Sequence, residues 1–238
     1  TATPVYPPFL SAPKLSGREL TSVPLKLTDE GWCMDLDAMQ AALKADTRLW
    51  LLCHPHNPVG RAWSGEELRA FAGFCRRHDL IVCSDEIHCD LILDADRRHL
   101  PLACVDDEIA RRSITLMAPS KTFNIPGLAC AFAVIPDAHL RRRFIGTARG
   151  IVPDVNVLGF VAAEAAFREG AEWHRGLIDT LRRNRDRVET AVAAMPGLAM
   201  THVVATYLAW IDARGLGVDD PVGFFEAAGV GLSNGADF

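Results

Sequence analysis

The chain has 238 residues, of which 49% are hydrophobic and 23% charged, and its net charge is −5. This composition is typical of a globular protein that is long enough for one large core or for a core with a smaller lobe. Short arginine clusters such as residues 141–143 are typical of a solvated helix face, so we expect no nucleic-acid partner. No apolar run is long enough to predict a membrane span.

The cysteine content predicts reduced thiols in a cytoplasmic protein. Seven cysteines are present, which is an odd number, and no C-x-x-C pair occurs. Histidines at 54, 56 and 88 supply metal-ligand types without a metal-binding spacing, so we expect no metal. The chain begins at Thr1 rather than Met and stops in a Gly-rich stretch, and we expect missing segments at both ends.

The first two thirds of the chain alternates short apolar runs with helical patterns, which predicts βαβ units and a mostly parallel sheet. The predicted strands cover residues 49–53, 80–83, 113–117 and 129–135. Between the first two strands, a capping box at Ser64 and Glu67 predicts a helix that ends near Arg77.

The last third of the chain is mainly helical in its pattern. Apolar residues at helical spacing predict three helices, at residues 138–148, 157–169 and 171–194. The third is long enough to bridge two lobes. The remaining segments predict a strand, a helix and a strand, at residues 206–211, 221–228 and 230–232.

Three polar residues each come just after a predicted strand, namely Asn57, Asp85 and Lys121. In open α/β sheets, ligands bind outside the carboxyl ends of the strands, so these side chains are expected to meet in one crevice. A lysine can form an imine with pyridoxal phosphate, and a carboxylate can keep the ring nitrogen of that cofactor protonated. An amide can donate a hydrogen bond to the phenolic oxygen of the ring. The sequence therefore predicts a pyridoxal-phosphate site.

Three motifs carry a resemblance to a known family. They are residues 55–60 (PHNPVG), 84–88 (SDEIH) and 118–124 (APSKTFN). Together they resemble the fold-type I pyridoxal-phosphate enzymes, and most of all the MalY/PatB cystathionine β-lyase branch of the class I/II aminotransferase family. Residues 3–6 (TPVY) and 206–212 (TYLAWID) are also similar to that branch.

The resemblance implies a role for each residue of the site. Lys121 resembles the lysine that binds the cofactor covalently, and it is expected to be catalytic together with Tyr6, the stacking aromatic. Asp85 resembles the partner of the pyridine nitrogen, and Asn57 resembles the donor to the phenolic oxygen. Ser120 resembles a phosphate ligand.

His88 also lies near the cofactor ring by position, and it stands where many aminotransferases carry tyrosine. Other positions depart from the family pattern. Ala118 replaces a phosphate-binding serine, and Ala129 replaces a phosphate-binding arginine that aminotransferases often have. The family's arginine for the substrate carboxylate has no counterpart in residues 1–238.

The resemblance implies an α/β fold with a three-layer, mostly parallel sheet flanked by helices, followed by part of a small α/β C-terminal domain. We expect an incomplete cofactor-binding large domain at residues 1–172. Residues 173–238 are expected to form the interdomain helix and the start of the small domain.

The implied activity is a carbon–sulfur β-lyase that converts cystathionine or a related S-substituted cysteine to a thiol, pyruvate and ammonia. An amino-acid aminotransferase is the alternative, because both reactions begin with removal of the same Cα proton. A non-catalytic, cofactor-binding regulatory protein or fragment is an alternative of another class. The resemblance also implies a homodimer with a small amino-acid substrate.

Overall fold

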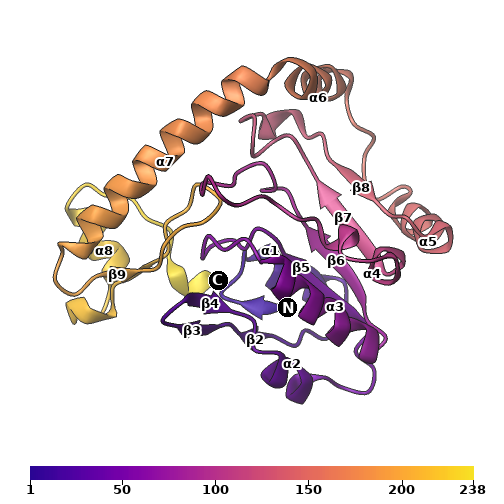
Figure 1. Cartoon of the computed structure of the whole chain (residues 1–238), viewed down its shortest axis with the longest axis horizontal. Coiled ribbons are helices and arrows are strands. Elements are labelled where there is room, and N and C mark those ends of the chain that lie inside the picture. Colours follow the sequence, from indigo (N-terminus) through magenta and orange to yellow (C-terminus); the bar gives the residue numbers. More distant parts are fainter.

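A computed structural model describes residues 1–238 and has a four-stranded sheet at its centre (Figure 1). The strands lie in the order β5 (Leu49–Cys53), β6 (Ile81–Asp85), β7 (Ser113–Met117) and β8 (Phe132–Val134). The first three run parallel and β8 is antiparallel to β7. The predicted α/β class with a mainly parallel sheet is confirmed.

The two faces of the sheet are covered by different helices. Trp50 and Leu52 of β5 belong to the main core together with Phe71 of α3 (Gly65–Arg77). Leu51 of the same strand packs on the opposite face, against a cluster that contains Phe9 of α1 (Pro8–Leu15). Because successive side chains of a strand alternate between faces, β5 is buried on both sides.

The helix α3 begins with the predicted capping box. The Ser64 hydroxyl accepts a hydrogen bond from the Glu67 N–H at 3.2 Å, and the Glu67 carboxylate accepts one from the Ser64 N–H at 2.7 Å. Glu67 also binds Arg61 at 2.6 Å, which ties the helix start to the loop that follows β5.

The first 42 residues contain elements that the sequence analysis did not predict. Strands β1 and β2 pair in parallel, and β3 and β4 form an antiparallel pair. The elements are β1 (Ala2–Thr3), α1 (Pro8–Leu15), β2 (Val23–Pro24), β3 (Lys26–Thr28), β4 (Gly31–Cys33) and α2 (Leu36–Ala42).

The predicted helices of the last third are confirmed as α5 (Ala138–Ala148), α6 (Val157–Glu169) and α7 (Ala171–Ala193). In Figure 1, α7 runs along the side of the molecule from α6 to the region of β9 and α8. No helix combines the length and the apolar composition that are required to span a bilayer. The remaining elements are α4 (Asp107–Arg111), β9 (Ala199–Met200), β10 (Ile211–Asp212) and α8 (Pro221–Ala227).

Three strand predictions were wrong at their ends or entirely. Of residues 206–211 only Ile211 is in a strand. Thr206 has φ 72°, which no strand residue adopts, and residues 207–210 pair with no other strand. Residues 230–232 form no strand, since they are exposed and have no partner to pair with. The run at 129–135 shortens to β8, because Ala129 takes a left-handed conformation with φ 50°.

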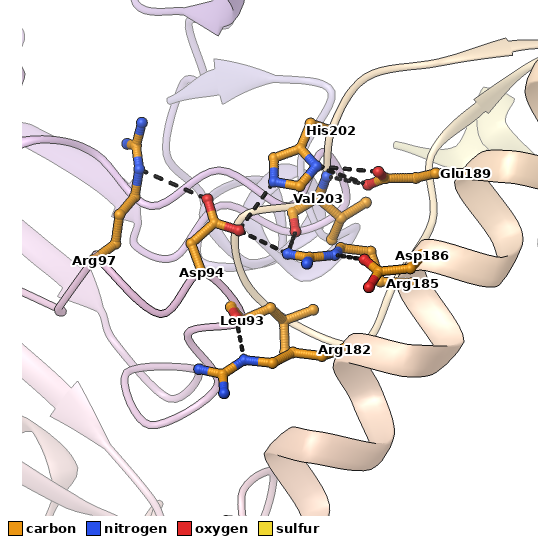
Figure 2. A network of polar contacts seen from close by, with 9 residues as sticks. All are labelled: Leu93, Asp94, Arg97, Arg182, Arg185, Asp186, Glu189, His202 and Val203. Atoms are coloured by element: carbon orange, nitrogen blue, oxygen red, sulfur yellow. Dashed lines mark hydrogen bonds and ion pairs between the residues drawn. The ribbon is translucent and has the colours of Figure 1, made fainter.

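A polar network fixes α7 to the loop after residue 92 (Figure 2). Asp94 accepts from Arg185 at 2.6 Å and from His202 at 2.9 Å, and Arg97 lies 3.7 Å away. The other ring nitrogen of His202 faces Glu189 at 3.1 Å. Since both ring nitrogens face carboxylates, the geometry favours the imidazolium form of His202.

We predict that His202 makes stability depend on pH. Partial burial opposes its protonation, but hydrogen bonds to Glu189 and Asp94 outweigh this and raise the pKa of His202. A raised pKa in the folded state contributes stability that is complete below the unfolded value of about 6.5 and is lost as pH rises through the folded value.

The free energy of unfolding of the unchanged chain should therefore exceed that of His202→Gln at about pH 6, with the difference shrinking above that pH. The effect should stay below about 1 kcal/mol, because the side chain is half exposed. Urea unfolding at several pH values measures it. A difference that does not change with pH would contradict the prediction.

Candidate functional site

The three residues that follow the strands lie at one edge of the sheet. Asp85 is the last residue of β6 and is level with Cys53 of β5 and Leu116 of β7. Asn57 and Lys121 lie in the loops that directly follow β5 and β7. The parallel register therefore brings an amide, a carboxylate and an amine to the carboxyl edge of the sheet, as the sequence predicts.

Asp85 is a largely buried carboxylate that accepts few hydrogen bonds from the chain. One of its oxygens accepts a hydrogen bond from the Ile87 N–H at 3.2 Å. Burial raises the pKa of Asp85, the charge of Glu86 adds to the rise, and the Ile87 hydrogen bond and the Lys121 ammonium oppose it. A cationic partner at the other oxygen would stabilise the ionised form.

His88 lies beside Lys121 and is almost fully buried. Burial and the nearby Lys121 ammonium lower the pKa of His88 to about 4. The imidazole is therefore neutral at physiological pH and does not add a second positive charge to the site.

Asn57 and Tyr6 are tied together through the backbone. The Tyr6 N–H donates to the Asn57 carbonyl at 3.1 Å, and the Asn57 N–H donates to the Cys53 thiol at 3.3 Å. The side-chain oxygen of Asn57 is buried and has no hydrogen-bond partner. Buried polar atoms are normally paired, and this oxygen can only accept a hydrogen bond, so its partner would have to be a donor.

The loop of Lys121 carries two hydroxyl groups. The Ser120 carbonyl accepts from the Ile125 N–H at 3.1 Å, while its hydroxyl makes no hydrogen bond within the chain. The Thr122 hydroxyl is buried and unpartnered, and the sequence analysis gave it no role. In the sequence, the only signal for Thr122 is its position directly after Lys121.

Glu86 points away from this edge and into the core. Its carboxylate accepts hydrogen bonds from the Ser84 hydroxyl at 2.7 Å and the Leu102 N–H at 3.1 Å, and it pairs with His99 at 2.6 Å. Asp85 ends β6 and Glu86 directly follows it, so their side chains point to opposite sides. Asp85 faces the site, and Glu86 holds residues 99–102 against the strand.

A segment from the C-terminal part of the chain also reaches the site. The ring of Tyr207 packs edge-on against His88, with ring centroids 5.9 Å apart. Sequence reasoning quoted the motif at 206–212 but assigned Tyr207 no role. Tyrosine occurs only twice in the chain, and this rarity is the one feature of the sequence that singles out Tyr207.

A model of a known protein family covers nearly the whole chain. The model of the family "Aminotransferase class I and II" matches residues 1–226. The chain belongs to this family. The match includes all the residues at the carboxyl edge of the sheet and Tyr207.

Individual relatives within the family are similar over most of this chain but are longer. The chain is 36% identical to cystathionine β-lyase PatB of Bacillus subtilis (strain 168), over 91% of this chain and 57% of the relative. The structure called OvoB has a TM-score of 0.97 and 51% identity, over 100% of this chain and 62% of that one. The chain therefore spans little more than half the length of the curated relative.

Cystalysin from Treponema denticola, whose structure contains a pyridoxal 5′-phosphate cofactor, is a third similar protein. It has a TM-score of 0.88 and 32% identity, over 95% of this chain and 57% of that chain. These similarities show the fold and the family of the chain.

We predict that Gly60, in the loop that carries Asn57, accepts no side chain. Gly60 has φ +71°, and a Cβ there would lie 2.7 Å from Val203 Cγ1 and 3.2 Å from the Ala205 carbonyl oxygen. Gly60→Ala should lower the free energy of unfolding by about 3 kcal/mol, from the left-handed conformation and the steric clash together.

Gly17→Ala is the matched control, because Gly17 has φ +67° and nothing within 4 Å of a Cβ. It should lower the free energy of unfolding by only about 1 kcal/mol. Urea unfolding of both variants provides the comparison. Equal losses would mean that residues 203–205 are not packed tightly against Gly60.

Proposed function

We propose that the protein containing this chain is a pyridoxal-phosphate-dependent carbon–sulfur β-lyase. Its substrate would be cystathionine or a related S-substituted cysteine, and its products a thiol, pyruvate and ammonia. The observation that carries the proposal is the meeting of Asn57, Asp85 and Lys121 at one edge of the sheet in a chain of this family. The name of the relative PatB supports the lyase reaction.

The residues of the site fit the proposed cofactor. Asp85 is buried, its pKa is raised, and it makes one hydrogen bond, so it suits a protonated ring nitrogen as its partner. The Asn57 side chain also carries an amide N–H group, which suits the phenolic oxygen of the ring as a hydrogen-bond donor. Ser120 offers a hydroxyl for the phosphate, and Tyr6 offers an aromatic face for stacking.

When bound, pyridoxal phosphate supplies an acceptor for the electron pair that is left when the substrate Cα loses a proton. Lys121 would hold the cofactor through Nζ and, once the substrate has displaced it, take the Cα proton as a general base. Asp85 would keep the proton on the ring nitrogen. His88 is neutral, so Lys121 and the protonated ring nitrogen would be the only positive charges next to Asp85.

The aminotransferase alternative uses the same site and the same first proton transfer. It is favoured by the family description. In the lyase the bond between Cβ and sulfur then breaks and the thiol leaves, whereas in the aminotransferase that bond stays intact and the proton would be delivered to the C4′ carbon of the cofactor. Product analysis separates the two, because only the lyase releases a thiol and pyruvate from cystathionine without an added acceptor. If an amino acid forms solely when a keto acid is supplied, the protein is an aminotransferase.

We also propose that the protein is a cytoplasmic homodimer. Four apolar side chains of α6, at positions 157, 158, 160 and 161, are 59–74% exposed. Such a patch is typical of a protein interface. All seven cysteines are free, which supports a reducing compartment. A solution mass equal to that of one copy would contradict the dimer.

The test of the cofactor site is a covalent adduct on Lys121. Adding pyridoxal phosphate should give a visible absorption band, and borohydride reduction should fix the cofactor to Lys121 in the peptide map. Lys121→Ala should abolish the reducible adduct and lower the turnover rate by at least a thousand-fold, because it removes both the covalent link and the general base.

Lys26→Ala is the control, since Lys26 is an exposed lysine far along the chain from the site loops. It should leave the band, the adduct and the turnover unchanged. An adduct on Lys14, Lys26 or Lys44 in place of Lys121 would contradict the proposed site. A folded protein that forms no adduct at all would favour a non-catalytic role.

A further inference from the structure

The two tyrosines of the chain, Tyr6 and Tyr207, come from opposite ends of the sequence and both lie at the site. Tyr6 is linked to Asn57 through the backbone, and Tyr207 packs against His88 with an interplanar angle of 74°. Their side chains are 40% and 45% exposed, and neither hydroxyl makes a hydrogen bond within the chain. Both phenols are therefore open to a molecule that enters the site.

Tyr207 is held in place by a buried segment, residues 203–206. The Ala205 N–H donates to the Gly60 carbonyl at 2.9 Å, and the Thr206 N–H donates to the Leu91 carbonyl at 2.8 Å. Gly60 follows the Asn57 turn, and Leu91 follows His88. The segment is therefore fixed to the two loops that carry these site residues.

The backbone turns sharply just before Tyr207. Thr206 has φ 72° and is fully buried, and its hydroxyl accepts a hydrogen bond from the Leu208 N–H at 3.2 Å. A β-branched residue with positive φ is strained and persists only where its surroundings fix it. The turn buries Thr206 and leaves the ring of Tyr207 partly exposed beside His88.

We propose that Tyr207 is a substrate-binding residue, whose hydroxyl donates a hydrogen bond to the amino-acid substrate. This inference rests on the proposed function, because the substrate class comes from it. The ring contact with His88 sets the position of the phenol, and the segment 203–206 sets its distance from the sheet edge.

The Tyr207 hydroxyl is protonated at neutral pH and can therefore donate a hydrogen bond. Burial, together with the neighbouring Tyr6, raises the pKa of Tyr207, so the hydroxyl keeps its proton at neutral pH. A role in packing alone would need only the ring. Tyr207→Phe separates the two roles, because it keeps the ring against His88 and removes only the hydroxyl.

Binding without turnover is measured in the Lys121→Ala background. The cofactor-loaded protein is titrated with S-methyl-L-cysteine, and the change in absorbance gives the dissociation constant. Adding Tyr207→Phe should weaken binding on the order of ten-fold, as expected for loss of a hydrogen bond to a polar or charged group. Ala209→Ser, an exposed change two residues further on, is the control and should have no effect.

In the protein with Lys121 intact, Tyr207→Phe should raise KM on the order of ten-fold and leave kcat within about two-fold, as expected for an interaction made equally in ground and transition states. The cofactor absorption band and the thermal midpoint should not change. A dissociation constant and a KM that both stay within two-fold of the parent would overturn the inference.

Different results would contradict the proposed function and the role of Tyr207. If no adduct forms on Lys121, the proposed function is wrong. If the adduct forms and cystathionine is turned over while Tyr207→Phe binds and reacts like the parent, only the substrate-binding role of Tyr207 is wrong.

Discussion

The site depends on a carboxylate that is buried at the end of a central strand. Asp85 lies at the carboxyl end of β6 with a single hydrogen bond from Ile87, and burial raises its pKa. An ionised group in such a position is stable only with a nearby positive charge. Lys121 supplies part of it, and a protonated ring nitrogen would supply the rest. The cofactor proposal follows from this incomplete charge balance.

The surrounding fold holds this carboxylate by separating two neighbouring acids. Asp85 faces the site, whereas Glu86 faces the core and is fully paired with Ser84, Leu102 and His99. Each carboxylate therefore has a fixed environment, and the two cannot exchange roles. The buried segment at residues 203–206 then holds Tyr207 against His88.

Much of the fold could be predicted from the sequence, because local signals determine it. The capping box at Ser64 and the apolar runs of β5 and β7 predicted those elements correctly. The meeting of Asn57, Asp85 and Lys121 could be predicted because neighbouring parallel strands end at the same edge of a sheet. The position of the buried segment at residues 203–206 could not be predicted, since its hydrogen bonds join residues far apart in the sequence and its turn places a threonine at positive φ. For the same reason Tyr207 received no role.

The most direct test is the protonation state of the cofactor's ring nitrogen. The protein is loaded with pyridoxal phosphate that is labelled with nitrogen-15 in the ring, and the chemical shift is measured across neutral pH, with Asp85→Asn for comparison. The account predicts a protonated nitrogen in the unchanged protein and an unprotonated one in Asp85→Asn. An unprotonated nitrogen in the unchanged protein, or a protonated one in both, would contradict the central role of Asp85.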